Sequence, residues 1–339
     1  LLTDTALPVT EVAFASGFGS VRRFNALFKH RYRLRPSQLR ERRSGASEAA
    51  AVDVLNFELS FRPPFDWPAV SAFLGVRSIA GVEAVEDRCY RRTVRIVIDG
   101  RQHAGWIAIE MSPRKPTLRI AVSASLAKAL PPVLSRVKAL MDLACHPADV
   151  AQALGTLAKR HPGLRVPGAF DGFEIAVRAI LGQQVTVAAA RTVAGRFAAT
   201  FGDPIATPFP SLTTLFPTAT RVAELSPGSI ARLGMPGARA RTVVALARAV
   251  ADERIVLMPN ADVESTLEGL RALPGVGEWT AQYIAMRALS WPDAFPHTDL
   301  GVMKALGETG ARRVLAAAEA WRPWRAYAVM HLWQSLTKE

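Results

Sequence analysis

The sequence predicts an α+β protein of several domains: a short helix-turn-helix segment, a small antiparallel α/β domain and an all-helical domain. Three observations predict this class. The chain has 339 residues, more than the roughly 100–200 that are usual for one domain. Alternating apolar and polar residues, typical of strands, are confined to residues 53 to about 123. From about residue 145 onward, helical periodicity recurs between Gly and Pro residues, and no convincing strand remains.

The boundaries follow from shifts in composition. Residues 1–43 hold nine basic residues against three acidic ones and predict a partial helix-turn-helix. Small and polar residues at 44–52 predict a linker. Residues 53–144 then form the α/β domain, and residues 145–339 form the helical domain.

Individual elements follow from local periodicity and from Gly and Pro positions. Strands are predicted at 55–61, 93–99, 105–111 and 117–123, with Gly100 in a turn. Helices are predicted in the α/β domain at 68–74 and 132–144, each with a Pro at the tolerated first position. Further helices are predicted at 170–182, 185–201, 236–251, 262–272, 278–289, 300–306 and 323–337.

The composition favours a nucleic-acid partner. Lys and Arg number 42 against 29 Asp and Glu, a net charge of +13, and such an excess attracts polyanions. A basic surface without a dedicated partner is the alternative. No stretch approaches the ~18–20 apolar residues of a membrane span. Two cysteines, Cys89 and Cys145, are too few for a disulfide framework or a four-cysteine metal site, and a reducing cytoplasm is expected. The chain opens without Met or a signal layout, so we expect the tail of a longer reading frame.

The basic segment predicts two short helices around a tight turn at residues 17–19. Arg22, Arg23 and Asn25 lie early in the second helix, which can enter a major groove. A helical hairpin with a solvated basic face is the alternative. The spacing A-x-x-x-G-F-x-S-x-x-x-F-x-x-x-F-K resembles the C-terminal half of an AraC-type DNA-binding domain. That family uses two such motifs, and the first is missing here.

The most informative stretch is residues 273–306. The sequence LPGVG from Leu273 to Gly277 predicts a hairpin between two helices. Its glycines allow backbone N–H groups to approach an anion, and the next helix adds its positive N-terminal end. A plain helix–helix turn explains the pattern equally well.

Three aromatic residues and one carboxylate accompany the hairpin. Trp279 and Tyr283 share one helix face, which core packing also explains. Asp299 begins a helix; it can cap that helix, or it can be an ionised group that stabilises a developing cation. Trp333, in the last helix, is a core residue on its own evidence.

Taken together, these segments resemble the helix-hairpin-helix DNA glycosylase superfamily, and within it the AlkA-type 3-methyladenine DNA glycosylase II. The resemblance extends over nearly all of 53–339, through FRPPFDW (61–67) and the segments 163–185, 233–247, 273–306 and 321–333. The AraC-like segment resembles the tail of an Ada-type adaptive-response activator fused to the glycosylase.

The resemblance implies roles for individual residues. Asp299 matches the catalytic carboxylate, and Trp279, Tyr283 and Trp333 match the aromatic pocket that stacks on the flipped base. Gln183 and Gln184 fall where the family inserts a wedge into the DNA, and the wedge position itself, often Leu, matches Gln184. Thr298 stands where a second acid can occur. The hairpin residues implied to contact the DNA backbone are Leu273, Gly275, Val276, Gly277 and Thr280.

The resemblance also implies the reaction. Bifunctional members place a Lys amine just after the hairpin, where this chain has Trp279. The expected enzyme is therefore a monofunctional glycosylase that releases alkylated bases from double-stranded DNA in base excision repair. It needs no cofactor, although main-chain carbonyls of the hairpin often hold a monovalent cation in the family. A monomer at the bacterial nucleoid is expected. The alternative is a DNA-binding regulator whose glycosylase fold has lost activity.

Overall fold

The computed structural model describes residues 9–10, 13, 20–32, 35–36, 54–259 and 261–337. The predicted turn at 17–19 and the predicted linker at 44–52 lie outside these residues. Within the basic segment, α2 (Val21–Tyr32) is described. Phe24 is buried there against Ala13, and Tyr32 packs against the main core.

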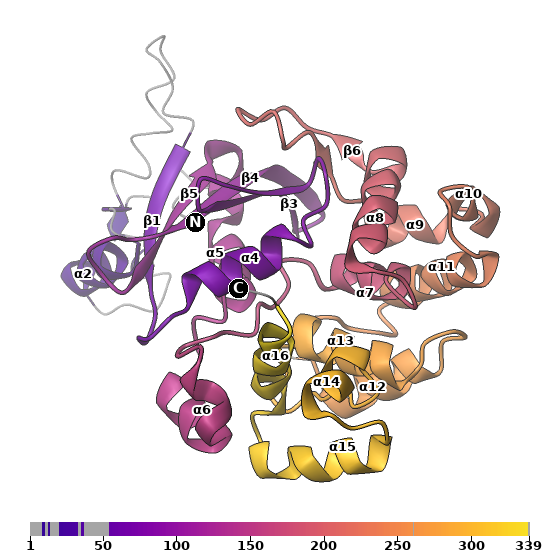
Figure 1. The fold of residues 1–339 in the computed structure, drawn as a ribbon. Helices are drawn as coiled ribbons and strands as arrows, with labels where there is room; N and C mark the ends of the chain where they lie inside the picture. Colours follow the sequence, from indigo (N-terminus) through magenta and orange to yellow (C-terminus); the bar gives the residue numbers. More distant parts are fainter. Residues whose placement is uncertain are drawn as a thin grey trace.

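A five-stranded antiparallel sheet forms the centre of the α/β domain, in the order β1-β5-β4-β3-β2. Its strands are β1 (Val54–Ser60), β2 (Glu83–Glu86), β3 (Cys89–Ile98), β4 (Arg101–Met111) and β5 (Thr117–Ser123). Asp99 and Gly100, both with positive φ, join β3 to β4, the geometry of a two-residue hairpin turn. Helix α4 (Trp67–Gly75) packs against β2 and β3, and the 3-10 helix η1 (Ala124–Ala129) packs against β4 (Figure 1).

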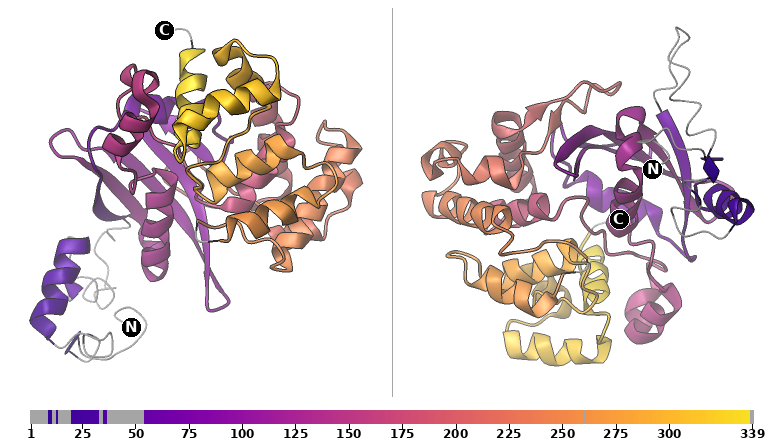
Figure 2. Two further views of the ribbon diagram at one scale, coloured as in Figure 1. Left: turned by 90° about the horizontal axis from the view of Figure 1, so that it is seen from below. Right: turned by 180° about the vertical axis from the view of Figure 1, so that it is seen from behind.

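The rest of the chain is almost entirely helical and lies beside the sheet as two groups of helices (Figures 1 and 2). In the first group α11 packs against α7, α9 and α10, whereas in the second α13 packs against α12 and α14 against α16. Contacts between α7 and α13 join the two groups. The bounds are α5 (Leu130–Leu140), α6 (Pro147–Leu154), η2 (Gly155–Lys159), α7 (Gly172–Leu181), α8 (Val187–Phe201), α9 (Ala219–Ala223), α10 (Pro227–Ala231), α11 (Gly237–Ala251), α12 (Val263–Arg271), α13 (Glu278–Ala288), α14 (Leu300–Leu306), α15 (Ala311–Ala318), η3 (Glu319–Trp321) and α16 (Arg325–Ser335).

The structure differs from the prediction in several local elements. Helices α6, α9, α10 and α15 were not predicted. Strand β2 was not predicted, because its four residues are too few to show alternation. The helical part contains a two-residue strand pair, β6 (Asp203–Pro204) and β7 (Thr214–Leu215). Helix α5 spans Leu130–Leu140 instead of 132–144, because the backbone turns to positive φ at Asp142, a conformation that ends a helix.

The α/β and helical parts share one continuous hydrophobic core, which includes Ile107 and Ile120 of the sheet and Ile284 of α13. This core fixes the sheet against the helices that carry the candidate site. Within the described residues, no helix is both long and apolar enough to cross a membrane.

Candidate active site

The hairpin between α12 and α13 is held by contacts with α11 and by an ion pair across the hairpin itself. Thr242 of α11 donates a hydrogen bond to the carbonyl of Pro274 at 2.7 Å. Gly275 has a φ of +86°, and a Cβ there would lie 2.4 Å from the Thr242 hydroxyl; glycine is therefore required. Arg271 and Glu278 form a two-bond ion pair across the hairpin, at 2.7 and 2.9 Å, and this hydrogen bonding lowers the pKa of Glu278. The hairpin is thus presented as a rigid surface feature.

Helix α13 begins after Gly277, whose backbone is extended and whose missing side chain faces open space within 4 Å. The first N–H groups of a helix have no partner within it and carry partial positive charge. Val276 and Thr280 are buried. Their side chains are therefore not available to DNA, and any contact predicted for them must come from the main chain.

The aromatic residues predicted for the pocket lie together. Trp279 and Tyr283, one turn apart on α13, are stacked with ring centroids 5.3 Å apart and planes 13° apart. The Trp333 ring on α16 lies 6.3 Å from Tyr283. Burial raises the pKa of Tyr283, but the charges of Arg287, Arg77 and Arg178 outweigh it and leave the pKa below its usual value. The hydroxyl accepts a hydrogen bond from Arg287 at 3.0 Å.

Asp299 is fixed by three donors. It is the N-cap of α14, and its Oδ1 accepts from the Val302 N–H at 2.9 Å. Trp333 donates its indole N–H to the same oxygen at 2.8 Å, and Trp279 donates to Oδ2 at 2.8 Å. A carboxylate has about four lone-pair positions. Of the hydrogen bonds between described residues, three use these positions, so Oδ2 keeps one for a ligand.

A cavity of about 1220 Å³ opens between the two groups of helices, and all four of these side chains line it. The sequence alone could not establish this convergence, since Trp333 lies 34 residues after Asp299. A helix cap explains one hydrogen bond of Asp299 but not the two indoles aimed at it.

The predicted wedge residues line the same cavity. Gln183 donates its amide to the Gly275 carbonyl at 2.8 Å and to the Thr280 hydroxyl at 2.9 Å. Arg239 also holds this loop, through the Gln183 carbonyl at 2.6 Å. Gln184 is exposed with a φ of +55°. The geometry therefore favours Gln184 for insertion into DNA, while Gln183 ties the loop to the hairpin.

Sequence reasoning missed several residues of the site. Gly301 is needed because a Cβ there would lie 3.0 Å from both Asp299 Oδ1 and the Trp333 ring. Leu300 lines the cavity and is 82% exposed. Arg77, from the α/β domain, also lines it. Gly301 and Leu300 adjoin Asp299 and could have been suspected from it, whereas Arg77 carries no local signal.

The predicted helix-turn-helix contacts lie in α2, apart from the cavity. Arg22, Arg23 and Asn25 are all exposed, and Phe24 between them is buried. Ser20 caps the helix through the Arg23 N–H at 3.4 Å. This face of α2 is available to a ligand.

A helix-hairpin-helix that leads into an aromatic cavity with a fixed carboxylate defines a DNA glycosylase of the helix-hairpin-helix class. The model of the HhH-GPD superfamily of base excision DNA repair proteins matches residues 177–324. The AlkA N-terminal domain matches residues 56–171, and a helix-turn-helix domain matches residues 1–42.

Individual proteins agree with these matches. The DNA-3-methyladenine glycosylase 2 of Escherichia coli is 35% identical over 82% of this chain and 96% of its own length. The probable bifunctional transcriptional activator/DNA repair enzyme AlkA of Mycobacterium tuberculosis is 38% identical over 99% of this chain and 68% of its own. The chain belongs to this AlkA family of DNA-3-methyladenine glycosylases, and it is a base excision repair enzyme that acts on DNA.

A solved structure shares the fold of this chain. A 3-methyladenine DNA-glycosylase from Archaeoglobus fulgidus superposes with a TM-score of 0.68 at 21% identity, over 83% of this chain and all of its own. The predicted class, a small antiparallel domain followed by a helix-hairpin-helix domain, is confirmed.

We expect Gly277→Ala to weaken binding to undamaged duplex about tenfold without changing thermal stability relative to a matched control. The added Cβ meets no protein atom within 4 Å, so it would occupy only the space in which a phosphate approaches the hairpin amides. The control is Gly310→Ala, at the equivalent N-cap of α15. Fluorescence anisotropy and melting temperatures measure the two effects; an unchanged Kd would place the hairpin outside the DNA interface.

Proposed function

We propose that this enzyme hydrolyses the N-glycosidic bond of alkylated purines such as 3-methyladenine and leaves an abasic site. The observation that carries the proposal is the pair of indole N–H groups that hold the two oxygens of Asp299, each at 2.8 Å, inside an aromatic cavity. The names of the relatives from E. coli and A. fulgidus point to the same substrate.

The proposed recognition step is base flipping. The target must leave the stack, which costs a few kcal/mol and less for a damaged pair, and Gln184 is the proposed residue that fills the gap. Tyr283 covers one face of Trp279, so the flipped base stacks on the other. A purine alkylated at N3 or N7 is a cation, and its attraction to an aromatic face contributes about 0.5–2 kcal/mol.

The proposed chemical step needs one carboxylate. The cationic base is already a good leaving group, so no general acid is required. Asp299 stabilises the positive charge that develops on the sugar and orients the attacking water with its remaining Oδ2 lone pair. The indoles of Trp279 and Trp333 hold the carboxylate in place and bind the base, which explains why the two aromatic residues and the acid occur together.

A monovalent cation on the hairpin carbonyls is a further proposal. The Pro274 and Gly275 carbonyls already accept hydrogen bonds from Thr242 and Gln183; each therefore has one lone pair left for a cation. Such an ion would add positive charge next to the DNA phosphates. Among the described residues, no cluster of three His, Cys, Asp or Glu side chains could hold a metal ion.

A second DNA-binding surface is proposed on α2. The helix-turn-helix match over residues 1–42 and the exposed Arg22, Arg23 and Asn25 support it. The M. tuberculosis relative is named as both a transcriptional activator and a repair enzyme, and we propose that the same pairing of functions applies here. We propose that the enzyme acts on chromosomal DNA in the bacterial cytoplasm, at the nucleoid.

The proposal is tested by incubating the protein with duplex DNA methylated at adenine N3 and measuring free base by chromatography. We expect release of 3-methyladenine and accumulation of abasic sites. Binding of the duplex without any base release would instead support the alternative, a DNA-binding regulator with a non-catalytic glycosylase fold.

A further inference from the structure

Arg77 enters the candidate active site from the α/β domain, two residues after the end of α4. Its guanidinium lies 3.8 Å from the centre of the Phe73 ring, and its Nη1 donates to the Phe73 carbonyl at 3.3 Å. The Phe73 ring is in turn stacked on Trp333, with 6.2 Å between centroids. Arg77 is therefore fixed against the aromatic wall of the cavity.

No carboxylate balances this charge. Arg77 takes part in none of the ion pairs among the described residues, and burial lowers its pKa, helped by the neighbouring Arg287 and Arg178. Tyr283 is the one neighbour that favours its charged form. A half-buried arginine without an acid is unfavourable in the free protein. Such groups occur where a ligand completes their hydrogen bonding.

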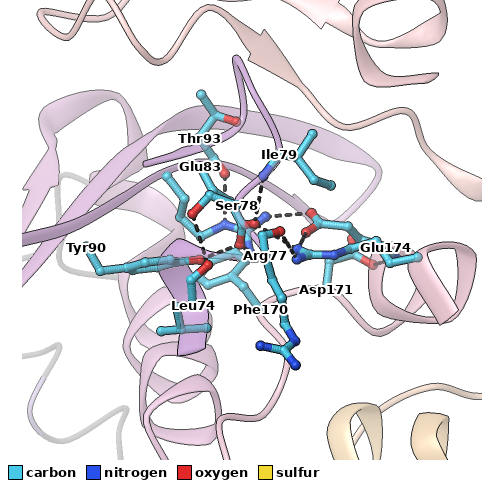
Figure 3. Close-up of polar contacts among 12 residues, drawn as sticks. Leu74, Arg77, Ser78, Ile79, Glu83, Tyr90, Thr93, Phe170, Asp171 and Glu174 are labelled. Atoms are coloured by element: carbon cyan, nitrogen blue, oxygen red, sulfur yellow. Dashed lines mark hydrogen bonds and ion pairs between the residues drawn. The ribbon is translucent and has the colours of Figure 1, made fainter. Parts of the chain in front are cut away.

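The nearest acidic residues, Glu83 and Glu174, are bound to arginines other than Arg77 (Figure 3). Glu83 binds Arg178 at 2.7 Å and accepts from the Tyr90 hydroxyl at 2.6 Å. Burial alone would raise the pKa of Glu83, but Arg178 and Arg92 lower it to about 2. The two carboxylates of Glu83 and Glu174 thus balance the charges of Arg178 and Arg92. Neither of them balances the charge of Arg77.

The same network fixes the backbone of Arg77 from the helical domain. Arg178 of α7 donates to the Arg77 carbonyl oxygen, while its other end is anchored on Glu83 and Glu174 at 2.7 and 3.1 Å. These groups are nearly all inaccessible to solvent, and buried networks of this kind specify one geometry. Arg77 is therefore a preorganised donor in the wall of the base pocket.

We propose that Arg77 is a specificity-determining residue that favours neutral flipped bases with a hydrogen-bond acceptor edge over cationic alkylated purines. The proposal rests on the proposed function, since it requires a base in this cavity. A guanidinium offers five N–H donors and no acceptor. It matches a ring carbonyl, as in hypoxanthine, the deaminated form of adenine, and is mismatched with the amino group of adenine.

The positive charge of Arg77 also favours a neutral base over a cationic one. Two like charges about 10 Å apart, at an effective dielectric constant of about 20, repel by an amount equal to roughly a tenfold factor in affinity. Arg77 thus weakens the binding of a cationic base in the pocket. A site built to hydrogen-bond its substrate also discriminates strongly against analogues that lack the partner.

The test compares single-turnover release of hypoxanthine and of 3-methyladenine from otherwise identical duplexes. Arg77→Met keeps the aliphatic packing on Phe73 but removes the donors and the charge. We expect the rate of hypoxanthine release to fall at least tenfold relative to the rate of 3-methyladenine release. Arg77→Lys keeps the charge and loses the planar set of donors, and should also lower hypoxanthine release.

Arg136→Met is the matched control, because Arg136 makes the same two contacts outside the cavity. Its Nη1 donates to the Phe170 carbonyl at 3.3 Å, and its guanidinium lies 5.7 Å from the Phe170 ring. The ratio of the two rates should not change in this variant.

Two results would overturn the proposal while leaving the proposed function intact: a parallel loss of both rates in Arg77→Met, or release of 3-methyladenine but no hypoxanthine by the unmodified enzyme. An unmodified enzyme that releases neither base would defeat the proposed function itself. If Arg77→Met does not fold, quenching of tryptophan fluorescence by free hypoxanthine, in the unmodified enzyme and in Arg77→Lys, decides the question. Equal affinity in both proteins would count against Arg77.

Discussion

Asp299→Asn should lower the rate of base release at least ~100-fold, the usual effect of removing one electrostatic stabiliser of a transition state. The amide keeps an oxygen for the Val302 N–H, which Asp299 Oδ1 now accepts at 2.9 Å, so α14 stays capped. It loses the negative charge, and its NH₂ group faces the Trp279 indole N–H that Oδ2 accepts at 2.8 Å. Folding and DNA affinity should be nearly unchanged, whereas the sugar cation loses its stabilising charge.

A control separates this effect from helix capping. Asp262 is the N-cap of α12, and its Oδ1 accepts from the Ser265 N–H at 2.8 Å, as Asp299 does for α14, but it does not line the cavity. Asp262→Asn should retain full activity. Single-turnover release of 3-methyladenine, with melting temperatures for both variants, makes the comparison. Equal activity of Asp299→Asn and the unmodified enzyme would mean that Asp299 only caps its helix.

Borohydride added during turnover should trap no covalent enzyme–DNA adduct, and the product strand should stay intact until hot alkali cleaves it. Trapping requires a Schiff base between a Lys amine and the sugar. Trp279 occupies the position of that amine, and none of the described residues that line the cavity is Lys. A known glycosylase/lyase treated in parallel serves as the positive control.

A strong adduct would contradict the monofunctional assignment. Lys304 of α14 lies one turn beyond Asp299 and is exposed, so Lys304→Ala would then show whether its amine is the nucleophile. The fold and family would be unaffected by that result.

The sequence by itself determined the local elements and the family. Periodicity located most of the predicted helices within two residues of their observed ends, as for α13, predicted at 278–289 and found at Glu278–Ala288, whereas α5 ends four residues before its predicted end. Such helices are set by contacts between residues three and four apart, which a sequence displays directly. Elements with little local signal, such as β2 and the β6–β7 pair, were missed because strands of two to four residues are too short to show alternation.

The candidate site was predicted in part. The resemblance to the glycosylase family gave Asp299, Trp279, Tyr283 and Trp333, and their roles in catalysis stay predictions. That both indoles bond the carboxylate was beyond the sequence, because helix α16 must first pack against α14 over Gly301. For the wedge, the resemblance matched Gln184 to the inserted position. The fold adds a physical reason, because Gln183 is bonded to the hairpin.

Arg77 marks the limit of sequence reasoning. It stands after a short helix in a different domain, with no motif around it, and neither charge nor spacing singles it out among 42 basic residues. Its place in the cavity depends on the continuous core that sets the sheet against α7 and on the buried ions that cross between them. The sequence shows directly which residues are close along the chain. The partners of a buried charged side chain depend instead on how helices and strands pack in the folded protein. That is why only the tertiary structure decided that Arg77 lies in the wall of the cavity.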